Sequence, residues 1–400
     1  MKKFFVGMIM SVASLAMVFA NNALSQEELF EATIKEVDMG GLSLQYQNVD
    51  DLESIVMAFV EVSAFSNVNA NAKINSNPMV KMQVDLAINT LKEVLKKANL
   101  NAMQSMAGSV KRVGEDTYLN KTFIYTGANP AGALYDIIGR ENKSFDYLKI
   151  VPENAVFAFS THVNMGVIYD ALYNNVLKNN PMAVQYIPLL EMQLGMPLAD
   201  FMKSLSGEYT GFATVAINAD DVLPQALIRI PDNAGALSNF LKMMLGTQEK
   251  MVQLPANPKH PSIAPVIVFA EKSIIVATDN ATLTQSVEAE ISGKNITTNA
   301  NFAPYKEYLQ NSGLSQMFFA LDQTQMQLIN SLFIVNDINY ELKPIFAIVE
   351  SQVTNDGYKT VMPCSFNLAS PAKILKLQSA LVRIMTENMD KLQNMEDLAE

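Results

Sequence analysis

The stretch PIFAIVESQVTNDGYKTVMPCSFNL (residues 344–368) indicates the fold most directly. Two runs of mainly apolar residues flank residues 354–357, where Asp-Gly supplies the positive φ that a tight hairpin turn needs. The stretch therefore predicts two antiparallel strands. Ser370 and Pro371 then provide an N-cap and a first-turn proline for a helix whose apolar residues recur at helical spacing as far as Leu392.

Two similar hexapeptides precede alternating segments further upstream. MQSMAG (103–108) and MKSLSG (202–207) are both followed by apolar–polar alternation around a turn, which predicts two more hairpins. We expect Gly108 and Gly207 to lie where a helix changes into the first strand of each hairpin. Glycine is suited to that position because chains often adopt positive φ on leaving a helix.

Each of these two hairpins leads into Ala-Gly-Ala-Leu, at 131–134 and at 234–237. Pro130 and Pro231 stand just before these segments, and proline is well suited to the first turn of a helix. We therefore expect each hairpin to be followed by a short helix, packed on the same face of its sheet.

A second element recurs, in which a strand is followed by a helix. GLSLQYQNVD (41–50) aligns with GLSQMFFALD (313–322) without a gap, and each ends in Asp, a favoured N-cap. The segments that begin at Glu153 and Glu271 show the same strand, polar break and helical pattern. The common order predicts an internal duplication.

Together these elements predict an α+β fold, with repeated units of antiparallel sheet and helices packed on one face. After residues 1–20, we place the units at 27–150, 151–310 and 311–400, the last with the hairpin and a long helix. The spacing is too long and uneven for a solenoid.

Three stretches carry a family resemblance. These are Pro152 with AVFAF (155–159), LGMPLADFMKSLSGE (194–208), and IIVATDN (274–280) with FAPYKEYL (302–309). They resemble a family of exported bacterial proteins of unknown function that repeats a proline-then-strand step along the chain. The resemblance extends over most of residues 30–340. It implies export and a duplicated α+β fold, and it implies no activity and no functional residues.

The first residues have the layout of a bacterial secretory signal. Lys2 and Lys3 precede a long uncharged run, and small residues allow cleavage after Ala20 or, alternatively, after Ser25. An uncleaved anchor is the other interpretation, because the uncharged run continues past Ala20. The later chain shows no stretch long enough to cross a bilayer. We therefore expect a periplasmic or secreted protein.

Charge and cysteine content restrict the function further. The formal net charge is −11, a sign that repels phosphate backbones, so a nucleic-acid partner is excluded. Cys364 is the single cysteine, and no internal disulfide can form. It lies in an apolar run that predicts a buried, inert thiol rather than a nucleophile.

The residues needed for most catalytic sites are scarce. Only His162 and His260 are available as a histidine base. His162 follows Ser160 and Thr161 at a predicted strand end, where a structural role is favoured. His260 lies in the proline-rich stretch 255–265, which predicts an exposed loop with either a connecting or a binding role.

Other motifs have ordinary explanations. Ser292-Gly293-Lys294 resembles the end of a phosphate-binding loop, but we interpret Gly293 as the end of a helix. Asp50-Asp51 and Asp220-Asp221 fit turns and helix caps rather than a calcium loop. The sequence has neither a zinc-binding motif nor a dinucleotide-binding motif, and we expect no catalytic residues, no metal and no cofactor.

Methionine is frequent, with 24 residues in a chain that has no tryptophan. Thioether binding of copper is one interpretation, and filling of core volume is the favoured one. The pairs concerned are Met79/Met82, Met103/Met106 and Met243/Met244.

These observations leave three hypotheses open. The favoured one is an exported, non-catalytic envelope or periplasmic protein with a binding or scaffolding role toward an unknown protein. The alternatives are a carrier of an apolar ligand in a Met-lined cavity and a hydrolase of unrecognised type. Dry packing of Met103, Met106, Met202 and Met243 would favour the first hypothesis over the carrier.

The signal pattern yields the first testable prediction. The mature protein should begin near Asn21 and should be recovered from the periplasmic or extracellular fraction. N-terminal sequencing of the purified protein checks this. Retention of Met1 in a membrane-bound protein would contradict it.

Overall fold

A computed structural model describes most of the chain. Outside its described residues lie the predicted signal at 1–20, the helix expected after Ser370, His260 and the pair Asp220-Asp221. The described residues are 25–49, 51–58, 89, 92, 96, 98–128, 130, 132–175, 177–179, 181–217, 222–256, 263–300, 302–323, 326–327 and 344–366.

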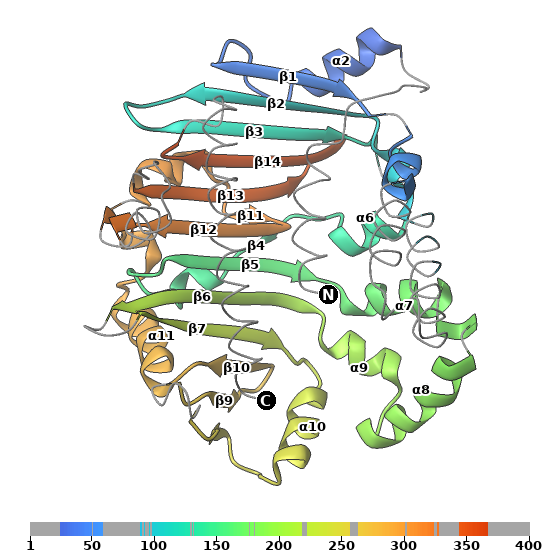
Figure 1. The fold of residues 1–400 in the computed structure, drawn as a ribbon, viewed down its shortest axis with the longest axis vertical. Helices are drawn as coiled ribbons and strands as arrows, with labels where there is room; N and C mark the ends of the chain where they lie inside the picture. Colours follow the sequence, from blue (N-terminus) through green and yellow to red (C-terminus); the bar gives the residue numbers. More distant parts are fainter. Residues whose placement is uncertain are drawn as a thin grey trace, which may run out of the picture.

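One antiparallel sheet of twelve strands is the frame of the molecule (Figure 1). Its order is β1-β2-β3-β14-β13-β12-β5-β6-β7-β10-β9-β8, and a two-stranded sheet pairs β11 with β4. The α+β fold predicted from the sequence is confirmed. The strands are β1 (Ser43–Asn48), β2 (Ser105–Arg112), β3 (Tyr118–Tyr125), β4 (Lys143–Ser144), β5 (Phe157–Val163), β6 (Gly207–Ile217), β7 (Val222–Pro231), β8 (Met251–Gln253), β9 (Val266–Phe269), β10 (Ser273–Ala277), β11 (Ser312–Gly313), β12 (Ser315–Leu321), β13 (Ile345–Val353) and β14 (Gly357–Cys364).

The helices lie at the ends of the strands and against the sheet (Figure 1). Short 3-10 helices supplement them, including η1 (Leu100–Ala102), η2 (Tyr147–Lys149), η3 (Leu177–Asn179), η4 (Ile296–Thr298) and η5 (Ala303–Tyr308). The α-helices are α2 (Gln26–Ile34), α6 (Ala133–Ile138), α7 (Met165–Asn175), α8 (Pro181–Leu194), α9 (Leu198–Ser204), α10 (Ala236–Leu245) and α11 (Asn280–Ser292).

The sheet contains three blocks of three consecutive strands, β1-β2-β3, β5-β6-β7 and β12-β13-β14. In each block the first strand is followed by helical residues before the hairpin begins. The last block in sequence lies between the other two, so β14 pairs with β3 and β12 pairs with β5. Hydrogen bonding is continuous across the blocks, and the unit boundaries at 150 and 310 stay a prediction.

The predicted hairpins are present, with one error in their placement. β13 and β14 pair around the turn at 354–357, and Gly207 opens β6 three residues after the last residue of α9. Gly108, however, lies inside β2, opposite Thr122 on one side and Gln45 on the other. The expected helix end at Gly108 is wrong because Ser105 and Ala107 are buried at a spacing of two, the period of a strand.

Both hairpins do lead into short helices. α6 and α10 begin after Gly132 and Gly235, which both have positive φ, +138° and +67°. Glycine therefore stands at the helix start in both copies, instead of the prolines that we expected there. Tyr135 of α6 stacks on Tyr358, and Leu237 of α10 packs with Ile274. Alternation along the paired strands places both contacts on the same face of the sheet.

The strand-to-helix steps predicted after Glu153 and Glu271 are confirmed as β5-α7 and β10-α11. α11 shows the expected signals at both ends. Asp279 caps its N-terminus by accepting a hydrogen bond from Thr282 N at 2.6 Å. Gly293 ends it in the left-handed conformation, φ +71°, as we interpreted it from the sequence.

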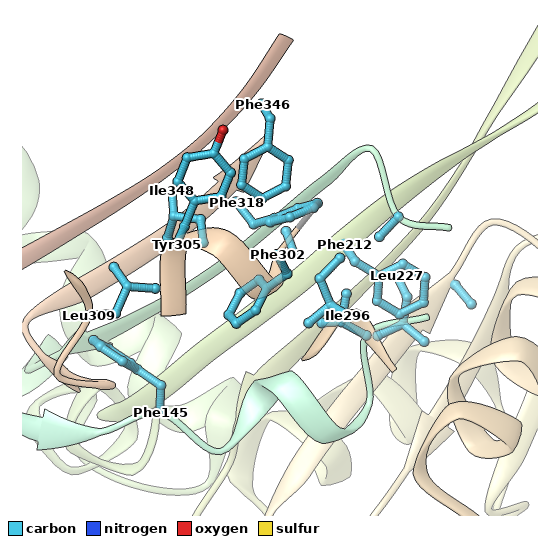
Figure 2. Packing of buried hydrophobic residues seen from close by; sticks show 14 residues of the cluster. Phe145, Phe212, Leu227, Ile296, Phe302, Tyr305, Leu309, Phe318, Phe346 and Ile348 are labelled. Atoms are coloured by element: carbon cyan, nitrogen blue, oxygen red, sulfur yellow. The ribbon is translucent and has the colours of Figure 1, made fainter. Parts of the chain in front are cut away.

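The main core lies on the opposite face of the sheet from α6 and α10. Figure 2 shows how its side chains pack. Paired strands contribute a row of apolar side chains there, including Phe318, Ile348 and Phe212. Tyr305 of η5 stacks on Phe346 at 4.5 Å and closes the cluster from outside the sheet. Near β10 both faces are buried, because Ile275 and Ala277 face this core while Ile274 and Val276 face α10. Helices thus cover both faces at this end, which extends the predicted one-faced packing.

A row of polar residues crosses the same face, two residues along each strand from the apolar row. Glu350, Gln316, Ser160 and Thr210 are direct partners on β13, β12, β5 and β6, and each is at most 2% exposed. Buried polar groups usually find hydrogen-bond partners. Gln316 donates to Glu350, and Ser160 Oγ donates to Glu208 at 2.6 Å, whereas Thr210 Oγ1 finds no partner among the described residues.

Glu350 is the most demanding member of this row, because it is a carboxylic acid with no exposed surface. Its two oxygens accept hydrogen bonds from Gln310 N at 2.9 Å, Asn311 N at 3.0 Å and Gln316 Nε2 at 2.6 Å. Gln352 Nε2 donates a fourth. The carboxyl group therefore fixes the loop that joins η5 to β11.

Cys364 behaves as predicted. It is fully buried, and burial raises the pKa of its thiol. Asn120 Nδ2 lies 3.1 Å from its sulfur. A thiol whose pKa is raised and that solvent does not reach is a poor nucleophile.

Substitution of Glu350 tests its role. Glu350→Gln should lower the free energy of unfolding by about 2–4 kcal/mol. The four partners of the carboxyl group are all N–H donors, and the NH₂ group of glutamine cannot accept a hydrogen bond from any of them. Urea unfolding at neutral pH measures this loss. Glu290→Gln on the exposed side of α11 is the control and should match wild type. A loss below about 0.5 kcal/mol for Glu350→Gln would contradict the role.

Candidate functional site

A cavity of about 830 Å³ opens between α6, α7 and the ends of β5 and β6. Figure 1 shows these helices side by side at one end of the strands. The walls of the cavity come from distant parts of the chain, namely residues 132–143, 162–174 and 206–207, and Leu314. A volume of this size suits a small-molecule or short-peptide ligand.

Two tyrosines hold the α6 wall against the sheet. Tyr135 has no exposed surface, and its hydroxyl donates to Asn99 O at 3.2 Å. Its ring stacks on Tyr358, whose hydroxyl donates to Gly139 O at 3.3 Å. Burial raises the pKa of Tyr135 to about 12, and the Tyr358 phenol adds to the shift.

The segment after α6 is attached to β13 by one amide side chain. Asn142 Nδ2 donates to Val353 O at 2.8 Å, and Asn142 Oδ1 accepts from Val353 N at 2.7 Å. This reciprocal pair imitates a hydrogen-bonded pair of strand residues. It fixes the adjacent lining residues Arg140, Glu141 and Lys143 relative to the sheet.

His162 lines the cavity at the end of β5. Its Nε2 lies 3.2 Å from Ser144 O, and its ring stacks on Phe145 with centroids 5.9 Å apart. Among the described residues, no hydrogen bond joins the imidazole to a carboxylate or to the hydroxyl of Ser206. The histidine is therefore a positioned, satisfied side chain, as the sequence favoured, at the edge of a cavity that the sequence did not predict.

Asn164 and Ser206 organise the start of α7 at the cavity floor. Asn164 Oδ1 accepts from Val167 N at 3.1 Å, as an N-cap does. Ser206 Oγ accepts from Gly166 N at 3.3 Å and lies 3.4 Å from Asn164 Oδ1. These side chains occupy the N–H groups of Gly166 and Val167, so these two groups are not offered to a ligand.

The cavity carries charges of both signs. Asp136 pairs with Arg140 at 2.6 Å within α6 and the turn after it. Lys143 and Asp170 also line the cavity, and within the described part of the chain neither makes an ion pair. Ile137 and Val167 add apolar surface. The arrangement can bind a polar ligand that brings complementary charges, and it offers no paired nucleophile and base.

Met79 and Met82 lie outside the described residues, and the other methionines selected from the sequence line neither of the two cavities found in the described part of the chain. Met103, Met106 and Met202 are half-buried, whereas Met243 and Met244 are 59% and 68% exposed. The predicted filling of core volume is therefore wrong for that pair, and the dry packing that would favour the first hypothesis over the carrier is not met at Met243. A second cavity of about 460 Å³ lies beside Tyr305 and Phe346. Neither cavity is lined by methionine.

The described residues contain neither a candidate metal site nor a candidate membrane span. No group of three or more His, Cys, Asp or Glu side chains there could hold a metal ion. No helix among them is both long and apolar enough to span a bilayer. Asp51 accepts a hydrogen bond from the Ser54 hydroxyl at 2.6 Å, just before the helical residues 52–58.

Comparisons with known proteins add little to this picture. No family profile matches the sequence, and no characterised protein matches it. Among solved structures, similarity was found to thyroxine-binding globulin complexed with thyroxine-fluorescein and to reactive-loop-cleaved human thyroxine-binding globulin. Each is 10% identical, with 84% of this chain and 93% of that chain covered, at a TM-score of 0.12. Similarity at that TM-score supports no conclusion about fold or ligand.

The raised pKa of Tyr135 yields a prediction for alkaline stability. Above pH 10 the unfolded phenol loses its proton, whereas the folded one keeps it until about pH 12. Stability that is present below pH 10 is therefore lost as the pH rises toward 12. At neutral pH, Tyr135→Phe should lower the free energy of unfolding by about 1 kcal/mol, because the hydrogen bond to Asn99 O is lost. Between pH 10 and 12, the free energy of unfolding should fall less in Tyr135→Phe than in wild type.

Urea unfolding across this pH range measures the effect. Tyr186→Phe is the control, since Tyr186 is 53% exposed, and it should follow wild type throughout. An alkaline loss of equal size in Tyr135→Phe and wild type would show that another group is responsible.

Proposed function

We propose that the protein is a non-catalytic binding protein of the bacterial periplasm or cell exterior, and that the cavity beside α6 and α7 is its binding site. The observation that carries this proposal is the cavity itself, about 830 Å³ in volume and lined by side chains of both charge signs. Its walls are fixed by hydrogen bonds from Tyr358, Asn142 and Asn164. A preformed site of this kind favours binding because little ordering is needed.

The lining groups favour a short peptide as the ligand class. Asp170 suits an ammonium group, and Lys143 suits a carboxylate. Asn174 and Asn164 add amide groups, and Ile137 adds apolar surface for a side chain. A peptide presents all of these features in one small molecule.

The extracytoplasmic location is supported by the signal-like pattern at residues 1–20 and by the acidic composition. Binding is favoured over hydrolysis because His162 uses Nε2 to contact a backbone carbonyl instead of activating a nucleophile. Binding of a polar ligand is favoured over carriage of an apolar one because neither cavity is lined by methionine.

A thermal-shift titration with trialanine tests the proposal. At about 1 mM peptide the melting temperature should rise by about 2 °C or more, because a ligand that binds only the folded state stabilises it. Lys143→Ala and Asp170→Asn should each abolish the shift. Lys294→Ala, an exposed lysine outside the cavity, is the control and should keep it.

Two results would count against peptide binding at this site. An unchanged melting temperature with trialanine and with longer peptides would contradict the ligand class. An equal shift in the cavity variants and in wild type would contradict the location. Release of alanine from the peptide would favour the hydrolase alternative.

A further inference from the structure

The two outer strands of the large sheet differ in how they end it. β8 is only three residues long, and short edge strands are one way in which proteins prevent unwanted pairing. β1 has six residues, SLQYQN, without charge and without proline. Figure 1 shows β1 as the outermost strand, and among the described residues only β2 pairs with it. Within the described part of the chain, β1 therefore lacks the usual protection of an edge strand.

Backbone groups of three β1 residues point to the open edge. Val49 N donates to Gln104 O at 3.0 Å, its direct partner in register with β2. Because hydrogen-bonded positions alternate along an antiparallel strand, the amides of Leu44, Tyr46 and Asn48 face away from β2. These groups are available to an added strand.

Exposed apolar side chains gather at the same edge. Met39, Leu42 and Leu44 are 65%, 52% and 40% exposed, within six residues of sequence. Phe30 of α2 is 39% exposed and contacts Tyr46, with ring centroids 4.9 Å apart. Several exposed apolar side chains close to an unpaired strand favour a protein–protein contact at this edge.

We propose that β1 pairs with β1 of a second copy, antiparallel and about a two-fold axis, so that the two sheets become continuous. In an antiparallel pair the same strand serves both copies, as an isologous interface requires. The partner would be charged like this copy, with a formal net charge of −11, but no charged side chain of β1 would enter the contact.

The pattern of β1 also selects a register. With Tyr46 opposite its own counterpart, Leu44 lies opposite Asn48, and all three outward residues form hydrogen-bonded pairs. Gln45 then lies opposite Gln47 of the other copy, and each amide can both donate and accept. If the register shifted so that Gln45 lay opposite Gln45 of the other copy, Asn48 would face Leu42, which lies outside β1.

The substitution Leu44→Pro tests the pairing between two copies without disturbing the pairing of β1 with β2. Leu44→Pro removes an N–H group that faces the open edge, which an edge strand tolerates. Leu44→Val is the matched control, since it also removes leucine but keeps the N–H group. Sedimentation velocity from about 1 µM to about 1 mM should show a dimer for wild type and for Leu44→Val. Leu44→Pro should raise the dissociation constant about tenfold or more.

Cysteine cross-linking tests the register and does not depend on the proline variant folding. Opposed residues at Gln45 and Gln47 would have Cα atoms about 4.5 Å apart, within disulfide reach. A mixture of Gln45→Cys and Gln47→Cys proteins should cross-link only as mixed dimers under mild oxidation. Cys364 is buried and should not react.

Three outcomes would overturn the proposal. The first is a wild-type protein that stays monomeric over the whole concentration range. The second is a dimer that Leu44→Pro, with an unchanged circular dichroism spectrum, leaves intact. The third is self-cross-linking of Gln45→Cys alone, which would require a different register.

Discussion

The buried carboxyl group of Glu350 is the constraint on which the site geometry depends. Such a group is stable only if donors surround it, and it receives two backbone N–H groups and two side-chain amides. Satisfying it forces the loop at 310–311 onto the sheet, with Asn311 in the left-handed conformation, φ +55°. That loop leads directly into β11, which pairs Ser312 with Ser144. Ser144 O then contacts the imidazole of His162 at the cavity edge. A carboxyl group on β13 thus sets the position of a histidine on β5.

Local elements of the fold could be predicted where turn and cap chemistry is encoded by neighbouring residues. The Asp-Gly turn at 356–357, the Asp279 cap and the Gly293 helix end are of this kind. The prediction of a helix end at Gly108 was wrong because the pattern MQSMAG is compatible both with a strand and with a helix end. Only its pairing with β1 and β3 decides between them. Partners 14 and 63 residues away in sequence cannot be read from a hexapeptide.

The candidate site was beyond sequence reasoning for a related reason. Asp136, His162, Ser206 and Leu314 meet only because the strands take a particular order, and no short motif joins them. One signal was available. Glu350 stands between Val349 and Ser351 in a strongly apolar strand, and an isolated acid in such a setting indicates a buried partner set. The identity of that set required the register of β12 against β13.

The strand order has a consequence for how the chain reaches its native state. The block β12-β13-β14 is synthesised last, yet it separates the first block from the second. β3 and β5 each lack one neighbour until residues 315–364 are available, and the β3–β14 contacts join residues more than two hundred positions apart. Such long loops make folding slow, and unpaired strand edges attract other chains meanwhile. Residues 315–364 therefore complete the large sheet. Without them, β1-β2-β3 and the strands from β5 to β8 would form two separate sheets, each with an unpaired edge.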